Sequence, residues 1–116
     1  MNKRFRLSPE EIRPIAQGYG ACIASDRITV YGQRVGFMYR ESPDGPNDSG
    51  WRFFSGDESQ EYADEPGNFA IYDVNTIANY DESIVPFLSA AAGKAYARGA
   101  DGKFHEEAIP GEPEAH

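Results

Sequence analysis

The sequence predicts a single α+β domain built on a small, mainly antiparallel sheet of about six short strands, with about three short helices. Three observations lead to this fold class. The length of 116 residues is close to the commonest size of one domain. The strand candidates follow one another as hairpins rather than alternating with long helices, which argues against a doubly wound sheet. Aromatic residues make up 13% of the chain, so we expect an aromatic core.

The first elements are expected to be a short helix and a hairpin. Ser8 can cap a helix that Pro9 begins, and Glu11 stands where a capping box requires it. Residues 21–25 and 28–31 are β-prone runs separated by two polar residues. This arrangement predicts two strands joined by a tight turn.

The middle of the chain predicts two strands, a loop and an acidic helix. Residues 34–40 read as a strand, in which Gly36 marks a bulge or a close approach by another backbone. A loop rich in Pro and Gly follows over 41–49, and the aromatic run 51–54 resumes as a strand. Residues 57–65 then read as a short helix with acidic residues in its first turn, where they favour the helix dipole.

The last third of the chain predicts one strand, two short helices and a hairpin. Residues 69–72 form the strand, Asp73 can cap the helix after it, and Asp81 can cap a further turn. Residues 94–106 predict a hairpin whose turn contains Asp-Gly. We expect the domain to occupy residues 1–107 and to be followed by a disordered acidic tail over 108–116.

The charge of the chain limits the classes of partner that it is expected to bind. The net charge is −8, from 11 basic and 19 acidic residues, and basic side chains cluster only at Lys3, Arg4 and Arg6. Nucleic-acid binding rests on basic side chains, so we expect none. The N-terminus lacks the apolar segment of a secretory signal, and no run approaches the roughly 20 apolar residues of a membrane span. We therefore expect a cytoplasmic protein that binds no membrane and attracts basic partners.

Cys22 is the single cysteine, so the chain forms no internal disulfide. It lies in an apolar run, where a cysteine is typically a small buried side chain. The competing interpretation is a nucleophile activated by His105, for which no local signature exists. Ser25, Ser55 and Thr76 have no base close to them in sequence either. We therefore assign no catalytic residue and expect a protein that is not an enzyme.

Carboxylates follow the aromatic strand at Asp57, Glu58 and Glu61. A divalent cation needs several converging oxygen ligands, but this spacing matches no calcium loop and no His or Cys lies nearby. A solvent-exposed helix face is favoured, and we expect no metal and no cofactor. One alternative stays open, a regulatory module that binds a small molecule or a metal through Asp57 and Glu58 together with Asn75 and Asn79, which share a helix face.

The most informative segment is residues 50–58, which read GWRFFSGDE. With the residues before it, and with segments at 25–28, 35–40 and 72–81, it resembles the immunity protein 33 domain family of bacterial polymorphic toxin systems, first catalogued as a domain of unknown function. The resemblance spans roughly residues 20–106. It implies an α+β domain that neutralises a toxin, the cognate protein partner, by direct contact.

The same segment divides into expected core and expected interface. Strand alternation puts Trp51 and Phe53 on one face and Arg52 and Phe54 on the other. We expect Trp51 and Phe53 to be core. An immunity protein needs a surface complementary to its toxin, often with acidic groups opposite basic ones. The candidate partner-binding residues are Phe54, Asp57, Glu58 and Glu61.

Overall fold

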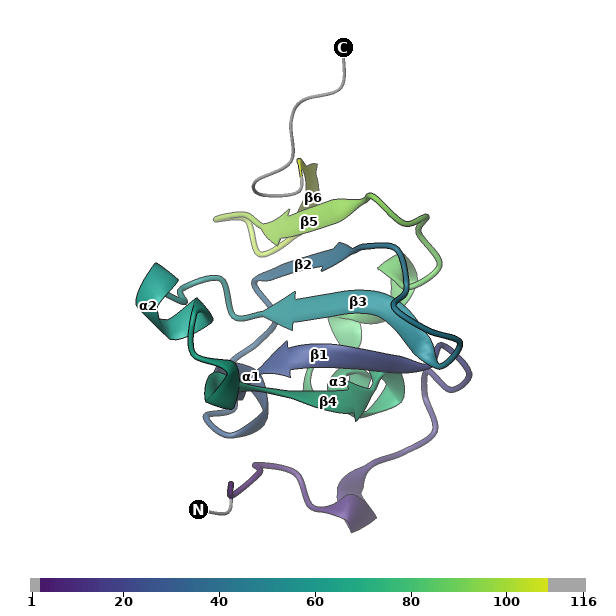
Figure 1. The fold of residues 1–116 in the computed structure, drawn as a ribbon, viewed down its shortest axis with the longest axis vertical. Coiled ribbons are helices and arrows are strands. Elements are labelled where there is room, and N and C mark those ends of the chain that lie inside the picture. Colours follow the sequence, from purple (N-terminus) through teal and green to yellow (C-terminus); the bar gives the residue numbers. More distant parts are fainter. Residues whose placement is uncertain (1–2, 109–116) are drawn as a thin grey trace.

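A six-stranded sheet dominates the computed structural model, which describes residues 3–108 (Figure 1). Its strands are β1 (Ala21–Ser25), β2 (Phe37–Arg40), β3 (Asp48–Phe54), β4 (Phe69–Asp73), β5 (Ala95–Arg98) and β6 (Phe104–Glu107). They lie in the order β4-β1-β3-β2-β5-β6. β1 and β3 pair in parallel, while the other neighbouring strands described here pair antiparallel. The predicted α+β class is confirmed.

Short helices connect the strands. They are α1 (Asp26–Thr29), α2 (Gln60–Ala63) and α3 (Val74–Tyr80), with 3₁₀ turns η1 (Pro9–Glu11), η2 (Pro66–Asn68) and η3 (Glu82–Phe87). Two expected caps are present, since Asp73 Oδ2 accepts the Asn75 amide at 2.9 Å and Asp81 Oδ1 accepts the Ser83 amide at 3.1 Å. Within residues 3–108, no helix has the length and apolar character needed to cross a bilayer.

The predicted hairpin at residues 21–31 is wrong in its second half. Residues 26–29 form α1, because Ser25 ends β1 and its hydroxyl accepts the Arg27 amide at 3.2 Å as an N-cap. Ile28 is fully buried, so core packing overrides its β-branched preference. β1 consequently finds its partners elsewhere, in β3 and β4.

Other boundaries also differ from the predictions. β3 begins at Asp48, so the loop expected over 41–49 is shorter and the strand expected over 51–54 is longer. The helix expected over 57–65 is reduced to α2, because Ser59 caps it and Asp57 and Glu58 stay in the preceding loop. The strand expected over 34–40 begins only at Phe37, since Gly36 lies against the Ser55 carbonyl, where a Cβ would overlap. The close backbone approach predicted at Gly36 is confirmed. The predicted disordered tail lies, apart from residue 108, outside the described residues.

The two faces of the sheet have different environments. One face packs against α1, α3 and η3, which lie behind the sheet in Figure 1, and the core forms there. Trp51 and Phe53 point into it and are fully buried, as predicted, with ring centroids 5.8 Å apart. Trp51 Nε1 also donates to the Leu88 carbonyl at 3.1 Å. Within residues 3–108, no helix lies across the middle of the opposite face, which is turned to the viewer in Figure 1 and which we call the open face.

Candidate partner-binding surface

Four aromatic side chains form a continuous group on the open face. β2 and β3 pair so that Phe37 stands opposite Phe54, and their ring centroids are 6.1 Å apart. Tyr39 stacks on Phe54 at 5.9 Å, and Phe69 of β4 meets Phe54 edge-on at 5.7 Å. We call Phe37, Tyr39, Phe54 and Phe69 the aromatic row. All four rings are half-buried, so each still presents apolar surface to solvent.

Phe69 can reach Phe54 because the strand between them carries a small side chain there. In the pairing of β1 with β4, Ser25 stands opposite Phe69. Ser25 turns its hydroxyl to α1, and its size leaves the two rings free to meet above it. Beyond Phe69, Tyr62 of α2 extends the group at 6.0 Å, and the guanidinium of Arg27 lies 4.7 Å from the Tyr62 ring centroid.

Glu58 is held rigidly beside the aromatic row. Its Oε2 accepts the Ser55 amide at 2.8 Å and the Ser55 hydroxyl at 3.0 Å, and its Oε1 accepts the Gly56 amide at 2.9 Å. These donors are neutral. No ion pair among the described residues includes Glu58, so its negative charge is fixed in position without a basic partner.

A pocket of about 450 Å³ opens between the aromatic row and the segment that leads into α2. Its lining residues are Phe37, Tyr39, Phe54, Gly56, Glu58, Gln60 and Ala63. Burial, followed by the nearby charge of Glu41, raises the pKa of the Tyr39 phenol. The pocket thus combines neutral aromatic faces with one fixed carboxylate.

The four residues expected to bind a partner lie in this region but differ in their contacts and exposure. Phe54 is the centre of the aromatic row, and Glu58 lines the pocket. Asp57 shares the single Ser55 hydroxyl proton with Glu58 and lies 3.5 Å from the Arg27 guanidinium. Glu61 is exposed on α2. Their role in binding stays a prediction.

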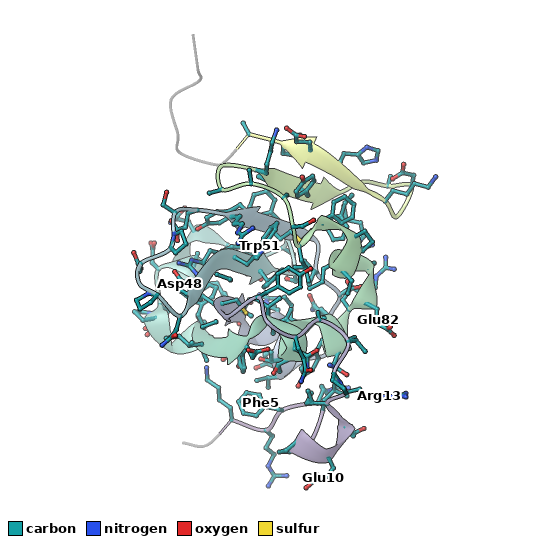
Figure 2. All side chains as sticks on the ribbon, turned by 90° about the vertical axis from the view of Figure 1, so that its right-hand side faces the viewer. Phe5, Glu10, Arg13, Asp48, Trp51 and Glu82 are labelled. Atoms are coloured by element: carbon teal, nitrogen blue, oxygen red, sulfur yellow. The ribbon has the colours of Figure 1, made fainter. Side chains whose placement is uncertain are left out.

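The open face also holds an ion cluster around one buried guanidinium. Arg52, which is 4% exposed, donates to both carboxylate oxygens of Asp48 at 2.8 and 2.9 Å and to Glu41 at 2.6 Å. The guanidinium holds the pKa of Asp48 well below its usual range, since hydrogen bonds to the ionised carboxylate favour that form. Figure 2 shows Asp48 and Glu82 on opposite sides of the sheet, with Trp51 between them.

The structure does not form the alternative sites considered from the sequence, which are a Cys22–His105 pair and a metal site. Burial raises the pKa of the Cys22 thiol, which faces the core on β1, whereas His105 lies on β6 and contacts Asp101 at 3.0 Å. In the described part of the chain, no group of three or more His, Cys, Asp or Glu side chains is arranged to hold a metal ion.

The amides proposed for a ligand site hold the N-terminal segment instead. Asn75 Oδ1 accepts the backbone amides of Ile15 and Ala16 at 2.9 and 2.7 Å. Asn75 and Asn79 both donate to the Arg13 carbonyl at 2.9 Å. These contacts occupy the two side chains on the covered side of the sheet, whereas Asp57 and Glu58 border the open face. The structure does not bring the four residues together.

Sequence reasoning missed Phe37, Tyr39 and Phe69 as members of this surface. The alternation of Phe37 and Tyr39 around Met38 indicates a strand with one aromatic face, and Met38 is fully buried on the other. Which other aromatic side chains meet Phe37 and Tyr39 depends on the order of the strands in the sheet. The order comes from long-range pairing, which the sequence pattern does not contain.

Comparison with known proteins assigns the chain to a family. The family model described as the Immunity protein Imm33 domain matches residues 22–108, which include all six strands except the first residue of β1. No match was found among curated proteins or among solved structures. The chain therefore belongs to the Imm33 immunity protein domain family.

Proposed function

We propose that this protein is a non-enzymatic, cytoplasmic immunity protein that neutralises a cognate bacterial toxin by binding it directly. The observation that carries the proposal is the family match over residues 22–108. The geometry of the open face supports direct contact as the means. Half-buried aromatic side chains next to a polar margin are typical of protein interfaces, whose centres are enriched in aromatic residues.

The proposed contact surface consists of the aromatic row and the acidic segment beside it, with Phe54, Asp57, Glu58 and Glu61 as its binding residues. The net charge of −8 favours a toxin with a basic surface, because complementary charge speeds association and selects partners. The aromatic side chains would supply most of the buried apolar area.

Co-expression with toxins encoded in neighbouring genes tests this proposal. The expected results are survival of cells that carry both genes and co-purification of the two proteins. The double variant Asp57→Asn/Glu61→Gln should weaken the complex, whereas Glu82→Gln, a charge removal on the helix-covered side, should not. Absence of both protection and a complex with every neighbouring toxin would contradict the proposal.

A further inference from the structure

The pocket beside Phe54 has two properties that together select a cation. Its aromatic side chains Phe37, Tyr39 and Phe54 carry negative π-faces, which attract a positive group within about 6 Å of the ring centroid. Its carboxylate, Glu58, is held by the backbone amides of Ser55 and Gly56 and lacks a basic partner in the described chain.

We propose that this pocket receives an arginine side chain of the partner protein. The identity of that partner as a toxin rests on the proposed function. A guanidinium is planar and weakly hydrated, so it stacks on aromatic faces at lower desolvation cost than an ammonium. Tyr39 and Phe54 present rings only 12° from parallel. Both residues line the pocket, where a guanidinium would contact their rings and direct its N–H groups to Glu58 and to the side-chain oxygen of Gln60.

The same chemistry already occurs within the chain. Arg27 lies with its guanidinium carbon 4.7 Å from the Tyr62 ring centroid and its Nη1 3.5 Å from Asp57. This internal pairing of a guanidinium with one ring and one carboxylate is at the far end of the aromatic group. The pocket offers the same pairing without an internal guanidinium to fill it, and its position on the surface leaves it open to a side chain from another molecule.

The size and charge of the pocket agree with one inserted side chain. At about 450 Å³ it is within the usual range for ligand pockets, which is about 300–1,000 Å³. The guanidinium of Arg52 pairs with Asp48 and Glu41 rather than with Glu58. The charge of Glu58 is therefore available to attract a positive group from a partner.

Titration of the ¹⁵N-labelled protein with N-acetyl-arginine amide tests this inference, with the citrulline derivative as a neutral probe of the same shape. The expected result is a set of saturable NMR shifts at Gly56, Glu58 and Gln60 with arginine and not with citrulline. Equal shifts with citrulline, shifts elsewhere on the molecule, or no shifts with arginine would overturn it.

Two variants distinguish binding at the pocket from attraction by the overall negative charge of the protein. Glu58→Gln should weaken arginine binding about tenfold, as expected for loss of one interaction with a charged group, while Glu82→Gln should leave it unchanged. Equal weakening by both would overturn the pocket. The two wild-type titrations decide the inference even if Glu58→Gln misfolds. Binding of the toxin without binding of arginine would contradict this inference alone. Binding of arginine without binding of any toxin would contradict the proposed function.

Discussion

At the scale of single residues, β3 shows how one strand serves both the fold and the surface. Phe53 is fully buried, whereas its neighbour Phe54 is half-buried in the aromatic row. The alternation of a strand makes this division readable from sequence, and the assignment of Trp51 and Phe53 to the core is confirmed. The ion cluster of Arg52 was not foreseen, because its partners Glu41 and Asp48 reach it only once β3 and the preceding loop are folded.

Phe53→Ala and Phe54→Ala compare these two environments directly. Phe53→Ala should lower the free energy of unfolding by roughly 3–5 kcal/mol, because it leaves a cavity in the core. Phe54→Ala should cost clearly less, since part of its ring is already in water. Urea unfolding of both variants measures the difference. Equal losses would contradict the division of β3 into a core face and an open face.

The pair Asp48–Arg52 predicts a loss of stability in acid. The pKa of Asp48 is lowered in the folded state, so its contribution is fully present above the unfolded-state pKa of about 4 and is lost as the pH falls below it. Urea unfolding at pH 7 and at pH 3 should show a larger loss for the wild type than for Asp48→Asn. Asp48→Asn itself should cost roughly 2–4 kcal/mol at pH 7, because it leaves a buried guanidinium partly unpaired. An equal pH dependence of the two proteins would argue against this account.

At the scale of elements, local signals located the caps and turns but not the pairing of strands. Asp73 and Asp81 cap the helices expected of them, since capping depends only on nearby residues. The C-terminal hairpin of β5 and β6 was predicted for the same reason. α1 was mistaken for a strand because Ile28 favours a strand locally, while burial against the sheet decides for a helix. The parallel pairing of β1 with β3 joins distant segments, and no local pattern predicts it.

The junction of β2 with the loop after β3 depends on a glycine at position 36. An added Cβ there would overlap the Ser55 carbonyl, and the Gly36 amide donates to the Phe54 carbonyl at 2.8 Å. Gly36→Ala should therefore lower the melting temperature markedly and disturb the loop that holds Glu58. Gly45→Ala is the matched control, because a Cβ there meets no atom within 4 Å. Similar melting temperatures for the two variants would show that this contact is not required.

At the scale of the whole molecule, a sheet covered on one face explains how a small domain combines a stable core with a binding surface. The helices and the buried side of the sheet supply the core, which leaves the open face free for a partner. Composition predicted the acidic character of the molecule. The position of the acids beside the aromatic row became visible only with the sheet order.

The net charge of −8 predicts that association with a basic toxin depends on salt. Raising the ionic strength from about 0.05 M to about 0.5 M should slow association strongly and change dissociation less, because screening acts on the approach of the two proteins. Stopped-flow or surface-binding kinetics measures both rates. An association rate independent of salt would contradict electrostatic attraction as a contribution to binding.

The central claim is that the open face binds the toxin, and hydrogen exchange of the complex tests it most directly. On addition of the toxin that co-purifies with the chain, backbone amides in residues 37–39 and 54–61 should become protected. Those of α3 and η3, on the covered face, should exchange as in the free protein. Protection confined to α3 and η3, with 37–39 and 54–61 unchanged, would contradict the account.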